Sequence, residues 1–337
     1  MKAPESHTTP KHVTVSSEHP QQAIETLEIA VLLPCHNEEV AIGRVIRNFR
    51  EALPTAAIYV FDNNSTDKTK EIAQKEGAIV REEALQGKGN VVRRMFSDID
   101  ADYYILADGD DTYDANASSE LLHCAINNHL DMVNGERKTE EAEAYRPGHR
   151  FGNKMLTKIV ALIFGNRIED MLSGFKVFSR RFVKSFPALS TGFEIETELT
   201  IHALELNMPI AEIETIYRGR PEGSESKLHT FRDGSRILLM ILLLIKEERP
   251  LQLFSTIFTI LATTSIVLAW PIVAEFMATG LVPRFPTAIL STGMMLLAFL
   301  SIVSGLILDT VTHGRREMKR MWYLSIPERS ARQPTLE

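Results

Sequence analysis

The 337-residue sequence has little cysteine and no excess of positive charge. Its two cysteines, Cys35 and Cys124, form no CxxC pair and lie near no histidine cluster, which argues against a zinc site and favours reduced thiols. The net charge of −7 argues against nucleic acid as the main partner, because nucleic-acid-binding domains usually present a basic surface. Residues 1–25 lack the apolar core of a signal peptide, and we interpret this polar stretch as a disordered tail.

Two stretches in the last third of the sequence lack charge altogether. Residues 251–274 are 24 consecutive uncharged residues, and residues 286–308 form a second uncharged, apolar stretch. At ~1.5 Å per residue, a helix over the first stretch is ~36 Å long, which exceeds the ~30 Å hydrocarbon core of a bilayer. Buried helices of soluble proteins rarely contain such long uncharged runs. We therefore predict a transmembrane hairpin of two helices over residues 251–310.

Basic residues mark the ends of this hairpin. Lys246 and Arg249 precede the first stretch, and four basic residues follow the second between positions 315 and 320. The connection between the stretches has Arg284 as its one basic residue. The positive-inside rule therefore predicts that both chain ends lie in the cytoplasm, as expected of a multi-pass protein of the inner (cytoplasmic) membrane.

The segments beside the hairpin have amphipathic or basic character. Residues 235–250 are apolar for only about three turns before a lysine, so we interpret them as an interfacial juxtamembrane helix. Residues 311–337 are interpreted as a basic cytoplasmic tail. The side chains of Trp270, Trp322 and Tyr323 are of the type that anchors at membrane–water interfaces.

Residues 26–234 alternate between short apolar runs and segments with helical periodicity. The apolar runs predict strands at 28–34, 57–62, 78–82, 103–108 and 129–137. The intervening segments predict helices at 38–53, 65–77 and 87–99. This alternation predicts an α/β domain with a mostly parallel, doubly wound sheet, in which ligands bind outside the carboxyl ends of the strands.

Polar residues gather where the predicted strands end. The clusters are PCHNEE at 34–39, DNNSTD at 62–67 and DGDD at 108–111. Taken alone, the second cluster is also a good turn and helix-cap sequence. Because the carboxyl ends of neighbouring parallel strands meet at one edge of a sheet, we expect the three clusters to lie close together.

The carboxylates of the third cluster repel one another unless a cation compensates them. A calcium loop of the EF-hand type does not fit, because its glycine and glutamate positions, counted from Asp108, are Tyr113 and Ser119. A Walker-type phosphate loop does not fit either, because Lys88 is not followed by serine or threonine. The remaining pattern is a D-x-D at a strand tip.

Asp108 and Asp110 can together bind one hard divalent ion, with water and a substrate phosphate completing its shell. Gly109 between them would let the backbone pass close to a bulky ligand. The pattern therefore predicts a site for Mg²⁺ or Mn²⁺ and an anionic substrate.

The sequence resembles family-2 glycosyltransferases, in particular the branch that makes polyprenyl-phosphate sugars, over about residues 28–250. The segments that carry the resemblance are VLLPCHNEE, DNNSTDKT, GKGNVVR, ILADGDD, LSGFKVFSRR and RGRPEGSESKL, in this order. The resemblance implies a GT-A nucleotide-diphospho-sugar transferase domain, which is Rossmann-like, followed by two C-terminal transmembrane helices. It also implies a UDP- or GDP-linked sugar donor, a polyprenyl phosphate acceptor and Mg²⁺ or Mn²⁺ as cofactor.

The resemblance also implies roles for individual residues. The implied donor-binding residues are Pro34, Asn37, Glu38, Asp62, Lys88, Asp108 and Gly109, with Asp108 and Asp110 as metal ligands. The implied acceptor-phosphate residues are Arg137, Arg150, Lys176, Arg220 and Lys227. The implied catalytic residues are Asp108, Asp110, Asp170, Arg137 and Arg220, although Asp170 is equally compatible with a plain structural hydrogen bond. Lys176 stands where the family more often has arginine, and this change loses two-pronged phosphate binding.

The implied reaction is an inverting transfer of a hexose to a lipid phosphate, giving a lipid-linked sugar for cell-envelope glycan or glycoprotein synthesis. A phosphate monoester has a second pKa near ~6, so it is already a dianionic nucleophile at neutral pH and needs little help from a protein base. One alternative is a processive polysaccharide synthase, but the sequence lacks the Q-x-x-R-W motif of those enzymes. A non-catalytic, membrane-tethered nucleotide-sugar binding protein is the other alternative. The identity of the sugar and association into homo-oligomers are left open.

Overall fold

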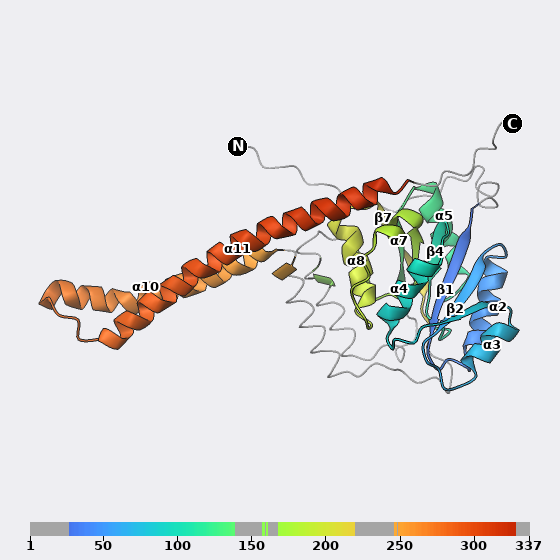
Figure 1. Cartoon of the computed structure of the whole chain (residues 1–337), viewed down its shortest axis with the longest axis horizontal. Helices are drawn as coiled ribbons and strands as arrows, with labels where there is room; N and C mark the ends of the chain where they lie inside the picture. Colours follow the sequence, from blue (N-terminus) through green and yellow to red (C-terminus); the bar gives the residue numbers. More distant parts are fainter. Residues whose placement is uncertain are drawn as a thin grey trace.

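The computed structural model describes residues 27–138, 157–158, 160, 168–219, 246–247 and 249–327. These residues form an α/β domain and a long helical hairpin that projects from it (Figure 1). The tail expected at residues 1–25 and most of the interfacial helix expected at residues 235–250 lie outside the described residues.

The α/β domain is built on one seven-stranded sheet with the order β3-β2-β1-β4-β6-β5-β7. The strands are β1 (Ile29–Cys35), β2 (Ala57–Asp62), β3 (Ile79–Glu82), β4 (Tyr103–Leu106), β5 (Met132–Lys138), β6 (Lys176–Ser179) and β7 (Ile210–Ile216). All neighbouring strands are parallel except that β6 runs antiparallel to both β4 and β5. The expected α/β domain with a mostly parallel sheet is therefore confirmed, with one antiparallel strand inserted.

Helices cover both faces of this sheet (Figure 1). They are α2 (Ile42–Ala52), α3 (Thr69–Lys75), α4 (Lys88–Asp98), α5 (Ala117–Asn127), α7 (Arg180–Ser185) and α8 (Ile195–Glu205). Successive side chains of a strand point to opposite faces, so β1 contributes Val31 to the core under α2 and α5 and Leu32 to the core under α4, α7 and α8. This double burial explains why β1 is a continuous apolar run.

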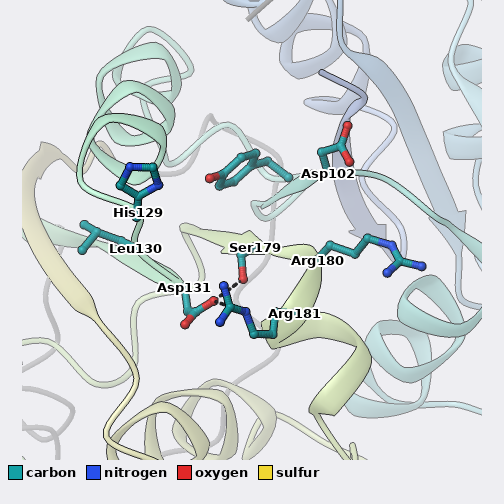
Figure 2. A pocket seen from close by; sticks show the side chains of 8 residues that line it. Asp102, His129, Leu130, Asp131, Ser179, Arg180 and Arg181 are labelled. Atoms are coloured by element: carbon teal, nitrogen blue, oxygen red, sulfur yellow. Dashed lines mark hydrogen bonds and ion pairs between the residues drawn. The ribbon is translucent and has the colours of Figure 1, made fainter. Parts of the chain in front are cut away.

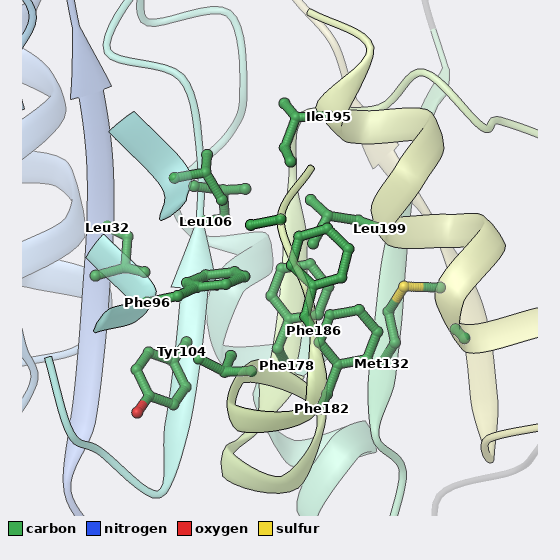
Figure 3. Close-up of a cluster of buried hydrophobic side chains, with 14 of the residues drawn as sticks. Leu32, Phe96, Tyr104, Leu106, Met132, Phe178, Phe182, Phe186, Ile195 and Leu199 are labelled. Atoms are coloured by element: carbon green, nitrogen blue, oxygen red, sulfur yellow. The ribbon is translucent and has the colours of Figure 1, made fainter. Parts of the chain in front are cut away.

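Aromatic side chains fill much of the core beneath α4, α7 and α8, as Figure 3 shows. The rings of Phe178 and Phe182 stack with centroids 4.4 Å apart, and Phe96 meets Phe178 edge-on at 5.9 Å. These contacts join β6 and α7 to α4. They fix the position of the antiparallel strand, which the sequence analysis does not predict.

The hairpin consists of α10 (Pro250–Thr279) and α11 (Phe285–Ser325). Both helices are long and apolar enough to be candidate membrane spans. Small polar side chains lie between them: Ser265 Oγ donates to the carbonyl of Ser291 at 2.7 Å, and Ser301 Oγ donates to the carbonyl of Phe254 at 3.1 Å.

Two expectations about the end of the chain differ from the structure. The segment expected to be a tail from residue 311 continues α11 as a helix to Ser325. Trp322 and Tyr323, expected to anchor at the membrane interface, instead contact the α/β domain. The reason is that α11 extends well beyond its apolar part and lies against this domain (Figure 1).

Candidate active site

The loops that follow β1 and β2 are hydrogen-bonded to each other. Asn37 has a left-handed backbone (φ 54°), and its Oδ1 accepts a hydrogen bond from the backbone N–H of Thr66 at 2.8 Å. The N–H of Asn37 donates to Ser65 Oγ at 2.9 Å, and the N–H of Glu38 donates to Thr69 Oγ1 at 2.8 Å. The first two polar clusters are therefore neighbours, as expected from the parallel sheet.

Asp62 ends β2 and is buried at the same edge of the sheet. Its Oδ2 accepts a hydrogen bond from the N–H of Ser65 at 3.1 Å, whereas its Oδ1 is buried and has no hydrogen-bond partner among the described residues. A buried carboxylate oxygen without a partner is costly, so this atom is suited to accept a hydrogen bond from a ligand. Pro34 lies half-buried on the neighbouring strand β1.

Lys88 begins α4 between two glycines that pack against the loop at residues 190–191. A Cβ at Gly87 or at Gly89 would lie 2.2 Å from a backbone carbonyl oxygen of this loop, and Gly87 also has a φ of +127°. The N–H of Gly89 donates to the carbonyl of Thr191 at 3.1 Å. Glycine is therefore required on both sides of Lys88. This packing against residues 190–191 fixes the position of Lys88 at the start of α4.

The ammonium of Lys88 is buried between two carboxylates. It pairs with Asp108 and with Glu196, and the distance to Glu196 Oε1 is 2.5 Å. Burial by itself would lower the pKa of Lys88, but the charges of Asp108 and Glu196 outweigh burial and raise this pKa above its ordinary value. Burial raises the pKa of Glu196, and the charge of Lys88 partly opposes this. Lys88 is thus a cation at neutral pH that contacts the first aspartate of the D-x-D.

The D-x-D follows β4 directly. Asp110 is buried, and its Oδ1 accepts hydrogen bonds from the N–H of Thr112 at 3.2 Å and from Thr112 Oγ1 at 2.6 Å. A Cβ at Gly109 would lie 2.4 Å from the sulfur of Cys35. Glycine is therefore required at position 109 because of the contact with Cys35 on β1, independently of any bound ligand.

The chemistry of the two aspartates fits a divalent ion that binds together with a substrate. The described part of the chain contains no group of three or more His, Cys, Asp or Glu side chains that could hold a metal ion by itself. Two carboxylates are enough for Mg²⁺ when substrate phosphates and water complete the shell, and oxygen ligands also suit Mn²⁺. Asp108 and Asp110 provide this pair of oxygen donors.

Arg137 lies near the carboxyl end of β5 and forms a bidentate ion pair with Asp170. Its Nε lies 2.7 Å from Asp170 Oδ2, and its Nη2 lies 2.8 Å from Asp170 Oδ1. The guanidinium also lies 5.5 Å from the centre of the Tyr217 ring. Two hydrogen bonds and a ring contact hold the plane of the guanidinium, so Asp170 orients Arg137.

Lys176 is fully buried in β6, away from solvent. Its ammonium donates to Asn134 Oδ1, and Asn134 Nδ2 donates to the carbonyl of Asp170 at 2.8 Å and to Glu212 Oε1 at 2.6 Å. Burial lowers the pKa of Lys176 from 10.5 to about 8. In this structure Lys176 belongs to a buried network that supports the backbone of Asp170, and its amine is not presented to an acceptor.

The other predicted acceptor residues, Arg150, Arg220 and Lys227, lie outside the described residues and stay predictions.

Two glutamates of α8 have roles that the sequence analysis does not assign. Glu196 pairs with Lys88, and Glu198 accepts hydrogen bonds from the N–H groups of Leu189 and Ser190, both at 2.8 Å. Glu198 therefore holds the loop against which the glycines beside Lys88 pack. The sequence feature that could have indicated these roles is the Glu-x-Glu-x-Glu spacing from residue 194 to 198. A buried charge has to be paired, so acidic residues elsewhere in the chain are candidate partners for Lys88.

Known proteins resemble this chain in sequence. Residues 30–186 match the family model described as Glycosyl transferase family 2. The chain is 31% identical over 300 residues to glycosyltransferase AglJ of Haloferax volcanii, covering 87% of this chain and 97% of that protein. It is also 31% identical over 223 residues to a dolichyl-phosphate hexose transferase of the same organism, covering 66% of this chain and 96% of that protein.

A solved structure supports the fold assignment. Glucosyl-3-phosphoglycerate synthase from Mycobacterium tuberculosis, in complex with Mn²⁺ and UDP-glucose, aligns with a TM-score of 0.54 at 21% identity, over 68% of this chain and 84% of that chain. At this identity the likeness concerns the fold alone. Together with the matched family model and the AglJ relative, it leads to one conclusion: the chain belongs to glycosyl transferase family 2.

Proposed function

We propose that this glycosyltransferase transfers a hexose from a nucleotide-diphospho-sugar to a polyprenyl phosphate at the cytoplasmic face of the inner membrane. The observation that carries the proposal is that Asp108, Asp110 and Arg137 lie at one edge of the sheet, so that an anionic donor and an anionic acceptor can meet there. The relative named as a dolichyl-phosphate hexose transferase and the two candidate membrane spans support a lipid acceptor.

The donor nucleoside is proposed to bind at the ends of β1 and β2. The buried Oδ1 of Asp62 can accept a hydrogen bond from an N–H of the base, which would supply the partner that this atom lacks. Asn37 and Glu38 belong to the neighbouring loop, and Pro34 lies on the adjacent strand. Lys88 then lies toward the diphosphate, where its ammonium can donate to an anionic oxygen.

Asp108 and Asp110 are proposed to hold Mg²⁺ or Mn²⁺ beside the diphosphate. A divalent cation bound there neutralises charge on the departing nucleoside diphosphate. The ammonium of Lys88 already pairs with Asp108, so a divalent ion has to compete with this ammonium for the Asp108 carboxylate. The shared fold with a synthase crystallised with Mn²⁺ and UDP-glucose is consistent with this assignment.

The acceptor phosphate is proposed to bind at Arg137. A planar guanidinium can bind two phosphate oxygens, and Asp170 holds this guanidinium in one orientation. Arg150, Arg220 and Lys227 are predicted to complete the acceptor site. Because the phosphate is already a dianion at neutral pH, the protein has to position it rather than deprotonate it.

In the proposed reaction, an oxygen of the lipid phosphate attacks the anomeric carbon of the sugar. The bond from this carbon to the diphosphate oxygen breaks, its electron pair leaves with the nucleoside diphosphate, and the anomeric configuration is inverted. The product is a sugar joined to the lipid through one phosphate, a donor for cell-envelope glycan or glycoprotein synthesis.

A screen of radiolabelled donors tests this function. The full-length protein in detergent is incubated with undecaprenyl phosphate, Mg²⁺ or Mn²⁺, and UDP-glucose, UDP-N-acetylhexosamines or GDP-mannose, and label in the lipid phase is counted. We expect one donor to give a glycolipid, and Asp108→Asn or Asp110→Asn to lower its formation roughly 100-fold or more. Asp98→Asn, which changes a carboxylate on the far end of α4, is the matched control. Absence of lipid-linked label with every donor would refute the proposal.

A further inference from the structure

The helix α11 is much longer than a membrane span requires. Its 41 residues correspond to ~61 Å, about twice the ~30 Å hydrocarbon core of a bilayer. The part that follows the apolar stretch lies against the α/β domain (Figure 1). It carries five basic residues, His313, Arg315, Arg316, Lys319 and Arg320.

The first contact between this part of α11 and the α/β domain is an ion pair. Lys319 Nζ lies 2.7 Å from Glu205 Oε2, and Arg316 Nε lies 3.9 Å from Glu205 Oε1. The side chain of Glu205 is only 4% exposed. A carboxylate buried to this extent is stabilised by a cationic partner, and α11 contributes two cations that pair with it.

The second contact is made by Tyr323, in the last turn of α11. Its hydroxyl donates to Asp131 Oδ2 at 2.5 Å, and the guanidinium of Arg181 lies 5.1 Å from the centre of its ring. Asp131 is itself buried, and its Oδ1 accepts a hydrogen bond from Ser179 Oγ at 2.6 Å. Figure 2 shows Asp131, Ser179 and Arg181 close together, at the end of the sheet where β5 begins. Next to Tyr323, the indole N–H of Trp322 donates to a backbone carbonyl of α7 at 2.9 Å.

Both contacts lie at the far ends of elements that reach the active site. Glu205 is the last residue of α8, and Glu196, which pairs with Lys88, is near its start. Asp131 directly precedes β5, and Arg137 lies near the other end of that strand. One helix and one strand therefore connect α11 to the donor side and to the acceptor side of the site.

We propose that Glu205, Lys319, Asp131 and Tyr323 form a clamp, the α11 clamp, that fixes the orientation of the active-site edge relative to the membrane hairpin. Its members are positioning residues: they touch no substrate, and they hold the α/β domain so that a phosphate at the bilayer surface reaches Arg137. Two buried acids, Glu205 and Asp131, both bind side chains of α11, and these two contacts favour a single position of the helix. This inference rests on the proposed lipid acceptor.

The test uses the full-length protein with two double variants. Lys319→Glu with Tyr323→Ala disrupts the clamp, because it places a carboxylate against Glu205 and removes the hydroxyl that contacts Asp131. Arg320→Glu with Leu324→Ala is the matched control, since both side chains are exposed and the change in charge is the same. For each variant, sugar transfer from the donor identified by the screen is measured with two acceptors. One is undecaprenyl phosphate in lipid nanodiscs, and the other is a short, detergent-soluble isoprenyl phosphate.

We expect the clamp variant to lose at least about tenfold in transfer to the lipid in nanodiscs, because small misplacements of a reactant slow reactions strongly. Its transfer to the short acceptor and its affinity for the donor should stay near wild type, which separates lost positioning from lost folding. In a Trp270→Phe background Trp322 is the single tryptophan, and the anisotropy of its fluorescence should fall when the clamp opens.

Three results would overturn the inference. They are wild-type transfer in nanodiscs by a clamp variant with lowered anisotropy, equal losses with both acceptors, and unchanged anisotropy in the clamp variant. A wild-type protein that transfers no sugar to either acceptor would instead refute the proposed function.

Discussion

The buried amine of Lys176 leads to a prediction that separates a structural role from acceptor binding. We consider Lys176→Met, which keeps much of the length and apolar volume of the side chain and removes its charge. The amine has a pKa of about 8 in the folded protein because it is buried, and the ordinary value is 10.5. At 1.36 kcal/mol per pKa unit, the difference corresponds to ~3 kcal/mol of folding free energy.

The direction of the pH dependence of stability follows from the fact that the folded protein loses the Lys176 proton at a lower pH than the unfolded chain does. Below pH 8 both states are protonated, and the wild type carries the full penalty of burying the charge. Between pH 8 and 10.5 the folded protein loses the proton while the unfolded chain keeps it, so the stability of the wild type rises with pH relative to the variant. Loss of the hydrogen bond to Asn134 lowers the stability of the variant at every pH and does not alter this trend.

The assay is thermal unfolding of both full-length proteins in detergent at pH 7 and at pH 10.5, followed by near-UV circular dichroism. Titration of other groups is common to both proteins and cancels in the difference. We expect the difference in Tm, wild type minus variant, to increase by up to roughly 6–12 °C toward high pH. A pH-independent difference, combined with a raised KM for the lipid acceptor, would refute the reasoning and would favour direct contact between Lys176 and the acceptor.

Three further predictions concern the site itself. Glu196→Gln leaves Lys88 tied to Asp108 alone, so Lys88 competes better with a divalent ion and we expect the Mn²⁺ concentration for half-maximal transfer to rise several-fold. Gly174→Ala places a Cβ 2.7 Å from Asp108 Oδ2, and we expect transfer to fall roughly 100-fold while the protein remains folded. Arg137→Lys keeps the charge but loses the two-pronged pairing, and we expect kcat with the lipid acceptor to fall about tenfold or more, with donor affinity unchanged.

Each of these predictions has a control or a contradicting outcome. Gly293→Ala adds a Cβ that meets no described residue within 4 Å beyond its own stretch of helix, and it should leave transfer unchanged. An unaltered metal dependence in the Glu196 variant would show that Lys88 does not compete for the aspartate. Weaker donor binding in the Arg137 variant would place that residue on the donor side.

The donor side of the site is the part that sequence reasoning predicts best. Asn37, Asp62 and Asp108 follow three strands of one parallel sheet, and parallel strands bring their carboxyl ends together. Their positions in the chain are therefore sufficient to place them at one edge. Their roles toward a ligand stay predictions.

The surroundings of Lys176 are a feature that sequence reasoning does not predict, and its role toward phosphate stays a prediction. The family motif places it beside Asp170, which suggests a contact with phosphate. The direction of its side chain, however, is set by the pairing of β6 with β4 and β5, whose paired residues lie 42 to 76 positions earlier in the chain. No local pattern reports which neighbours a four-residue strand will have.

The α11 clamp is invisible to sequence analysis for a similar reason. Hydropathy identifies the apolar part of α11 and ends where charged residues begin. The contact between Tyr323 and Asp131 joins residues 192 positions apart, and neither belongs to a motif. A tail and a docked helix of the same composition cannot be distinguished without the partner surface.

Strand β6 also constrains the order in which the sheet can be assembled during synthesis. The four strands β3, β2, β1 and β4 all precede residue 107 and pair with one another. Among the described strands, β5 reaches this group only through β6, which the ribosome delivers some forty residues later. Until then β4, an entirely apolar strand, has an open edge that could pair with another nascent chain. The growing polypeptide therefore most needs protection from aggregation after β4 has been synthesised and before β6 pairs with it.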